Sequence, residues 1–339
     1  MKKIFIILIA LSLSATSRSQ DLELLLLAKN DANLLMRNYM SPIMNGMMNG
    51  LNNGWNHTAK THKKFGFDIT INANAAIVPN SEKSFLFNHS DYQYLSLESG
   101  SSNINTVMGS VNNSLIGIKI PAAGNTYKIA QFTMPDGVGD DLPLNAVPSP
   151  MIQASIGLPT STDISVRFLP SVNSDDVKAN LIGFGVKHNL MQYFGPLDKL
   201  PLNVSVFGGF TTMNTTYNIQ NNSALSGNNQ EATFKLNTYT FQALASLDFP
   251  LITLYGGIGY DKGSSDLKIN GSYVLEYTID GTANKVTETV TNPIDLDFET
   301  SGARATLGAR LNLAFFKIFA DYTIKDYNTL SAGIAFSFR

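Results

Sequence analysis

The sequence predicts an all-β fold: a transmembrane antiparallel β-barrel of roughly 10–14 strands with a short N-terminal helical segment. Three observations predict it. The last stretch, Tyr327 to Arg339, alternates apolar residues with small or polar ones at the strand period of two. Earlier segments share this alternation and place their charged residues on one parity. The connections between them alternate between short and long, as in outer-membrane barrels.

The final strand is the clearest element. Leu330, Ile334 and Phe338 fall on its apolar side, and the strand ends with an aromatic residue next to the chain end. A membrane barrel must close its last strand against its first, because an open edge would leave backbone groups unpaired in lipid. We therefore expect this closure, with outer-membrane lipid as one partner. We also expect the barrel-assembly machinery to recognise residues Tyr327 to Arg339.

Composition narrows the function classes. The chain has 339 residues, a formal net charge of −2, 15% charged residues and no cysteine. Without cysteine there is no disulfide framework, no thiolate metal site and no lipid-anchored N-terminal cysteine. The near-neutral charge gives no support for nucleic acid as a partner.

Residues 1–19 have the pattern of a cleaved signal peptide. Lys2 and Lys3 precede the apolar run 4–13, and small residues then lead to cleavage before Gln20. No later segment reaches the ~20 apolar residues of a membrane-spanning helix. A secreted, strand-rich chain leaves two locations, the outer membrane or the periplasm, and the barrel pattern favours the outer membrane.

Residues 20–64 are predicted to be an N-terminal periplasmic or plug helical segment. Asp21 can cap a helix over 21–51, which Pro42 is expected to interrupt. One interpretation is a packed helix at the periplasmic mouth or in the lumen. The other is a movable plug whose methionines, such as Met44 and Met47, touch an apolar ligand.

The polar stretch 55–64 is expected to connect this segment to the first strand. His57 and His62 are five residues apart, a spacing that does not place both on one helix face. No carboxylate lies nearby in the sequence, so no metal site is predicted.

The barrel is assigned to residues 65–339, beginning with a strand over 67–78. Residues 80–150 are ambiguous between further hairpins and a long structured loop, and regular alternation returns at Met151. Short connections fall at 159–163 and 248–251, and long loops at 218–230 and 262–292. An even number of strands places both termini in the periplasm.

The charged residues of the predicted strands form the candidate site. They are expected to face the lumen, because on the lipid face each would cost ~2–4 kcal/mol near the midplane. One interpretation is a structural network, with Asp68 and Asp321 pairing with arginines. The other is a cationic lumen that attracts small anions or the carboxylate of an amphipathic solute. The lumen-facing candidates are Asp68, Arg167, Lys187, Arg304, Arg310, Lys317 and Asp321, and Arg339 shares their parity.

No catalytic site is predicted, and the protein is expected not to be an enzyme. No histidine has an identifiable serine and carboxylate partner. Gly208-Gly209 and Gly256-Gly257 are not followed by a helix, so they do not form phosphate loops. No cofactor is expected.

Several stretches resemble a family of uncharacterised Bacteroidota outer-membrane-type proteins, defined only as a domain of unknown function. They are L-N-N-G-W-N-H-T-A-K-T-H-K at 51–63, G-F-D-I-T at 66–70, I-G-L-P-T-S-T-D at 156–163, G-F-G-V-K-H-N-L-M-Q-Y at 183–193, L-P-L-N-V-S-V-F-G-G-F-T at 200–211, and the final strand. This resemblance implies location and fold but no activity. More loosely, a helical plug before a barrel is similar to the outer-membrane fatty-acid and aromatic-hydrocarbon transporters.

The expected function is passive passage or uptake of a small solute, hydrophobic or amphipathic, through a partly plugged lumen. The alternative is a non-transporting structural or surface-binding barrel whose external loops contact a partner.

Overall fold

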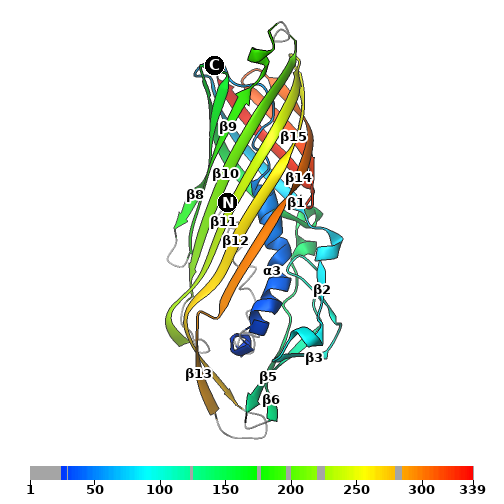
Figure 1. Ribbon diagram of the computed structural model, residues 1–339, viewed down its shortest axis with the longest axis vertical. Helices are drawn as coiled ribbons and strands as arrows, with labels where there is room; N and C mark the ends of the chain where they lie inside the picture. Colours follow the sequence, from blue (N-terminus) through cyan, green and yellow to red (C-terminus); the bar gives the residue numbers. More distant parts are fainter. Residues whose placement is uncertain are drawn as a thin grey trace.

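Strands with one apolar and one polar face close into a ring when both edges can pair, and this chain forms such a ring (Figure 1). The computed structural model describes residues 24–28, 30–122, 125–173, 177–195, 200–219, 226–278 and 285–338. The predicted signal peptide at 1–19, the capping residue Asp21 and the terminal Arg339 lie outside these residues.

Within the described residues, ten strands form the barrel, in the hydrogen-bonded order β11-β10-β9-β8-β7-β1-β16-β15-β14-β12, and β12 pairs back with β11. Every neighbouring pair is antiparallel. The barrel strands are β1 (Phe67–Ile77), β7 (Ala146–Leu158), β8 (Thr162–Asn173), β9 (Val177–Asn189), β10 (Leu202–Asn218), β11 (Ser226–Asp248), β12 (Ile252–Thr278), β14 (Ile294–Leu313), β15 (Phe316–Ile324) and β16 (Thr329–Phe338).

The predicted closure of the last strand on the first is confirmed. β16 pairs with β1 from Phe67↔Phe338 to Ala76↔Thr329, so neither strand presents a free edge along this seam. The predicted all-β barrel is confirmed, with the strand number at the lower bound of the expected range.

The two ends of the barrel differ. At one end β1 begins and β16 ends, and the turns 159–161, 249–251 and 314–315 connect neighbouring strands. We call this the short-turn end; it is the upper end in Figure 1, near the C-terminus. At the opposite, long-strand end, β11 and β12 continue for 23 and 27 residues.

The predicted loop at 262–292 is therefore mostly wrong, whereas the predicted loop at 218–230 lies between β10 and β11 but is shorter than expected. β11 already begins at Ser226, β12 runs to Thr278, and β13 (Lys285–Thr291) pairs with β12. The sequence pattern did not reveal these strand extensions, because their outward residues are polar. A strand surrounded by water needs no apolar face.

An apolar belt surrounds the short-turn half of the barrel. Outward side chains such as Phe184, Phe241 and Leu307 are 52%, 64% and 75% exposed. Farther along β12 and β14, the outward residues become charged. They are Lys262, Asp266 and Lys268 on β12, and Asp295, Asp297 and Glu299 on β14. Since a lipid-facing band spans only ~9–11 residues of a strand, the long-strand half stands beyond the membrane.

Of the ambiguous region 80–150, residues 146–150 belong to β7, and the described residues of 80–145 add no barrel hairpin. They build an extension beside the helix at the long-strand end (Figure 1). Its elements are η2 (Asn80–Glu82), β2 (Ser84–Leu86), η3 (His89–Asp91), β3 (Leu95–Ser99), β4 (Asn103–Asn105), β5 (Leu115–Ala122), β6 (Asn125–Thr133), η4 (Gly139–Asp141) and η5 (Pro143–Asn145). Ile104, Met108, Ile116 and Ile118 are buried in one apolar core with Leu35 of the helix, so helix and extension stabilise each other.

The N-terminal segment forms η1 (Leu24–Ala28) and one continuous helix, α3 (Asn30–Leu51). The predicted interruption at Pro42 is wrong. Pro42 cannot donate to the carbonyl of Asn38, but the extension supplies bonds to this part of the helix: Val107 N–H donates to the next carbonyl, Tyr39, at 3.0 Å. No helix among the described residues is long and apolar enough to cross a membrane.

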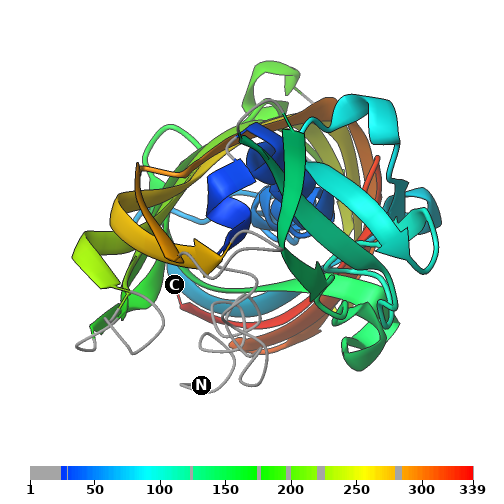
Figure 2. The same cartoon turned by 90° about the horizontal axis from the view of Figure 1, so that it is seen from below.

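Helix α3 starts at the long-strand end and enters the lumen (Figures 1 and 2). Asp31 in its first turn accepts hydrogen bonds from the backbone N–H groups of Tyr94 and Leu95, at 2.5 and 3.1 Å, which ties the helix to the extension. The helix thus lies in the lumen, one of the two positions that the sequence left open, and on the side of the barrel opposite the short turns. The short helix η6 (Met191–Tyr193) lies at the short-turn end, after β9.

Candidate functional site

The lumen is occupied by the chain itself. After α3, residues 52–66, which we call the plug, run through the barrel to the short-turn end, where β1 begins. Their path can be followed along β7, whose residues are contacted in chain order. The successive contacts are Gly46 with Val147, Gly50 with Ser149, the Trp55 carbonyl with Gln153, and the Phe65 N–H with Gly157. The helix and the plug therefore cross the barrel from one end to the other.

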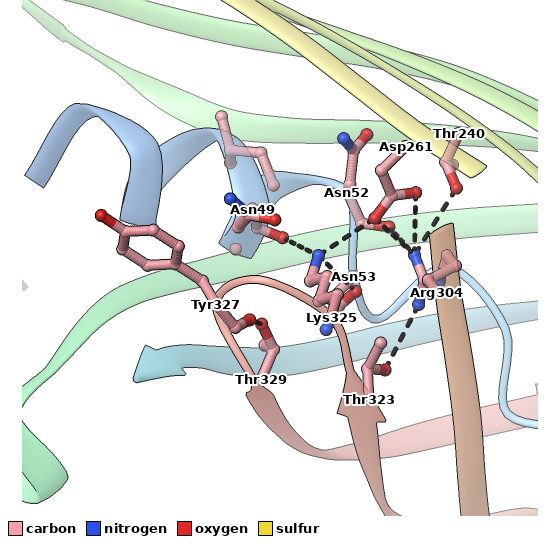
Figure 3. A network of polar contacts seen from close by, with 12 residues as sticks. Asn49, Asn52, Asn53, Thr240, Asp261, Arg304, Thr323, Lys325, Tyr327 and Thr329 are labelled. Carbon is pink, nitrogen blue, oxygen red and sulfur yellow. Dashed lines mark hydrogen bonds and ion pairs between the residues drawn. The ribbon is translucent and has the colours of Figure 1, made fainter. Parts of the chain in front are cut away.

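Three buried cations hold the junction between α3 and the plug. Lys325 Nζ donates to the Asn49 carbonyl at 2.8 Å and Arg304 Nη1 to the Asn52 carbonyl at 2.9 Å, as Figure 3 shows. Arg167 donates to the carbonyls of Leu51 and Asn53, at 2.9 and 2.7 Å. The last carbonyls of a helix lack intrahelical partners and carry partial negative charge, so cations stabilise them. We call Arg167, Arg304 and Lys325 the clamp.

The clamp has few counterions. Asp261 pairs with both Arg304, at 3.3 Å, and Lys325, at 3.0 Å. No ion pair is found for Arg167 within the described residues. Its guanidinium lies 3.7 Å from the Trp55 ring centroid and donates to Gln153 Oε1 at 3.1 Å. A fully buried guanidinium needs such partners, so Arg167 depends on the plug as much as the plug depends on Arg167.

Strand β1 fixes the turn at the end of the helix. Asn72 Nδ2 donates to the Gly54 carbonyl at 2.7 Å, and Asn74 Nδ2 to the Gly50 carbonyl at 3.0 Å. Gly54 has a φ of +69°, and a Cβ there would lie 2.6 Å from Asn74 Oδ1. This turn requires glycine both for its backbone and for its space.

Near the short-turn end the plug is held by carboxylates. His57 Nε2 and His62 Nε2 lie 3.4 and 3.2 Å from Asp68 Oδ2. Asp163 Oδ2 contacts His62 Nδ1 at 3.0 Å and Lys187 Nζ at 3.2 Å. The inference that these histidines lack a nearby carboxylate is therefore wrong, because β1 folds back alongside the plug. No cluster suited to a metal ion is found among the residues described.

The structure places the predicted site residues in separate networks. Arg167 and Arg304 belong to the clamp, and Asp68 and Lys187 to the histidine network. Arg310 contacts His57 Nδ1 at 3.0 Å and Asp248 at 3.5 Å. The expected pairing of Asp68 and Asp321 with arginines is not the one found: Asp321 accepts a hydrogen bond from Tyr255 at 2.9 Å. Lys317 lies near the short turn and donates to the Ala314 carbonyl.

Sequence reasoning missed several members of these networks. Asp163 and Asp261 occupy inward positions of regular strands, so the same parity argument would have found them. Lys325 follows β15 in a turn, where no periodicity marks its direction.

An apolar cavity of about 130 Å³ lies between α3 and the barrel wall. It is on the long-strand side of the clamp, since Leu169, which lines it, follows Arg167 along β8. Among the described residues, no charged side chain lines this cavity. Its apolar lining includes Ile43, Met44, Met47 and Leu51 from α3, and Met151, Leu169, Leu181, Met213, Phe234 and Leu267 from the wall.

A second, polar cavity of about 260 Å³ lies at the short-turn end, between the plug and the wall. Its lining includes the plug residues Lys60, His62 and Lys63, together with Lys187 and Arg310 from the wall. The clamp and Trp55 lie between the two cavities, so the lumen is closed at mid-height.

These features define a class: a transmembrane β-barrel whose lumen is occupied by its own N-terminal segment. The chain belongs to DUF6588, described as a family of unknown function, which matches residues 1–338. The predicted membership of a domain-of-unknown-function family is thus confirmed, whereas the Bacteroidota origin stays a prediction. No curated protein matches the chain in sequence.

Solved structures similar to the chain are β-barrels with low sequence identity. Ail, the attachment invasion locus protein of Yersinia pestis, is 9% identical, with 81% of this chain and 99% of that chain covered and a TM-score of 0.26. The translocator domain of the autotransporter NalP from Neisseria meningitidis is 10% identical, with coverages of 82% and 90% and a TM-score of 0.30. A Pseudomonas aeruginosa FadL homologue is 11% identical, with coverages of 81% and 89% and a TM-score of 0.20.

Proposed function

We propose that this protein is an outer-membrane barrel for uptake of a small, uncharged hydrophobic solute. The solute binds between α3 and the wall and moves on only when the plug leaves the clamp. The apolar cavity carries this proposal. Its lining is almost entirely hydrocarbon and methionine thioether, so a neutral hydrophobe gains from burial there while a carboxylate would lose its hydration.

The sides of the membrane follow from the connections. Outer-membrane barrels keep short turns in the periplasm and longer elements outside. With this orientation, α3, the extension and the apolar cavity face the exterior, and the polar cavity faces the periplasm. The solute would then reach the apolar cavity first and meet the closed clamp before the periplasm.

A disulfide lock tests this mechanism, because the chain has no cysteine of its own. Thr58 in the plug and Ser246 on β11 lie with their hydroxyl oxygens 3.2 Å apart. The Thr58→Cys/Ser246→Cys variant should join plug and wall when oxidised. The matched control is Ser155→Cys/Ser165→Cys, a cross-strand pair with hydroxyl oxygens 3.0 Å apart that joins wall to wall.

The readout is entry of the neutral fluorescent probe N-phenyl-1-naphthylamine into intact Gram-negative cells expressing each variant. The oxidised plug lock should reduce entry to the level of cells without the protein, and reduction should restore it. The oxidised wall lock should leave entry unchanged. Equal entry with the plug locked and released would refute a plug that gates uptake.

The second candidate is a non-transporting barrel that contacts an external partner. The extension favours it, because this structured unit stands beyond the membrane belt beside α3. On this alternative the clamp is purely structural, and cells with the wild-type protein admit no more probe than cells without it.

A further inference from the structure

We propose that the polar cavity at the short-turn end is a binding site for a phosphate group. The site goes beyond the proposed function, because it lies on the other side of the clamp from the apolar cavity. Five cationic side chains line it, against a single lining carboxylate, Asp68. The cations are Lys60 and Lys63 of the plug and Lys187, Arg310 and Lys317 of the wall.

The carboxylates around this cavity are already engaged. Asp68 contacts His57 and His62, Asp163 contacts His62 and Lys187, and Asp248 lies 3.5 Å from Arg310. The deeper cations Lys187 and Arg310 are therefore each paired with a carboxylate, and the excess positive charge of the cavity comes from the plug lysines Lys60 and Lys63.

The two plug lysines of the cavity, Lys60 and Lys63, form no ion pair with any described residue. Both have exposed side chains. In the wall, Arg310 Nε is buried without an acceptor among the described atoms. The cavity thus combines excess positive charge with unused donor capacity.

The cationic donors of this cavity favour a phosphate group as the ligand. A phosphate group carries close to two negative charges and several acceptor oxygens, so it can accept from donors on more than one side. The donors here come from two sides: Lys60 and Lys63 from the plug, and Lys187, Arg310 and Lys317 from the wall. A ligand bound between them would join plug to wall at the short-turn end, as the clamp does at mid-height.

The test measures binding of inorganic phosphate to the purified full-length barrel in a non-ionic detergent by equilibrium dialysis at constant ionic strength. The wild type should bind one phosphate saturably. The variant Lys60→Glu/Lys63→Glu should bind at least ten-fold more weakly. The control Lys64→Glu/Lys235→Glu makes the same charge change at two exposed lysines that do not line the cavity, and its affinity should stay within two-fold of wild type.

Two further measurements sharpen the result. Tighter binding of glycerol 3-phosphate than of inorganic phosphate would assign the site to a phosphate ester, and equal binding to free phosphate. Phosphate should also reduce quenching of Trp55 fluorescence by acrylamide in the wild type but not in Lys60→Glu/Lys63→Glu. The proposal is overturned if wild type and this variant bind phosphate equally, or if the control loses binding to the same extent. Neither outcome depends on uptake of the hydrophobic probe.

Discussion

Arg167 on β8 donates to the carbonyl of Asn53 at 2.7 Å, although 114 residues separate the two along the chain. This contact joins the barrel wall to the plug at the clamp, between the apolar and the polar cavity. No carboxylate pairs with Arg167 in the described part of the chain, so the carbonyls of Leu51 in α3 and Asn53 in the plug, with the Trp55 ring, replace a counterion. Movement of the plug would therefore expose a buried charge and open the lumen in the same step.

Replacing Arg167 should loosen the plug. Arg167→Ala leaves the Leu51 carbonyl without its side-chain donor and the Asn53 carbonyl with only the longer hydrogen bond from Asn74 Nδ2, at 3.3 Å. A buried carbonyl that loses its donor costs about 1–3 kcal/mol. Because Trp55 is the only tryptophan, its emission reports directly on the plug, and it should shift to longer wavelength as water enters. Arg37→Ala, which removes an exposed hydrogen bond to the Asp297 carbonyl, is the control and should leave the emission unchanged. An unshifted spectrum in Arg167→Ala would show that the clamp does not hold the plug.

Comparing Gly54→Ala with Gly195→Ala separates the effect of backbone strain from the effect of crowding. At Gly54 an alanine meets an unfavourable φ of +69° and the side chains of Asn72 and Asn74 at 2.7 and 2.6 Å. At Gly195 an alanine meets a similar φ of +59° with nothing within 4 Å. We expect Gly195→Ala to cost about 1 kcal/mol of unfolding free energy and Gly54→Ala about 2–4 kcal/mol. Denaturant titration of both variants measures the difference, and equal losses would argue against tight packing of the plug on β1.

Filling the apolar cavity should block the solute. Ala232 of β11 lines the cavity, and phenylalanine there would occupy much of its volume. Ala245 is on the same strand but faces outward within the apolar belt. Entry of N-phenyl-1-naphthylamine into cells should fall several-fold for Ala232→Phe and stay unchanged for Ala245→Phe. Unimpaired entry in Ala232→Phe would remove this cavity from the uptake route.

The extension should lose stability in strong acid through Glu98. The hydrogen bond that Ser96 donates to Glu98 lowers the pKa of the Glu98 carboxyl, and so does pairing with Lys119 and Lys128. Together they outweigh the small effect of burial and bring this pKa from 4.5 to about 2. Since the folded pKa is below the unfolded one, the contribution is complete above about pH 4.5 and is lost as the pH falls through about 2.

Hydrogen exchange of residues 95–120 between pH 5 and pH 2 measures this effect. Glu98→Gln should already show the faster exchange at pH 5 and respond less to acid. If both proteins respond equally, other carboxylates determine the acid sensitivity of the extension.

Alternation predicted the barrel strands well where one face meets lipid. The first strand, the strands after Met151 and the terminal closure all follow from a period of two, because lipid tolerates only apolar side chains on that face. The same rule failed for β11 and β12 beyond the belt. There both faces accept polar residues, so the pattern no longer distinguishes a strand from a loop.

The helix shows a second limit. Pro42 alone predicts an interruption, but packing against the extension and the hydrogen bond from Val107 keep α3 continuous. Local propensity is a weak guide where tertiary contacts hold a helix together across a missing hydrogen bond.

By itself, the sequence determined the class of fold and which parity of each strand faces inward, because lipid imposes the same rule on every residue of the belt. It could not determine which partners the inward charges find. Arg167, Arg304 and Lys325 come from three separate places in the chain, and only barrel closure brings them to the same helix end. Those contacts close the charged lumen. Carbonyls at the end of the helix and in the plug accept the hydrogen bonds that these cations would otherwise offer to a solute.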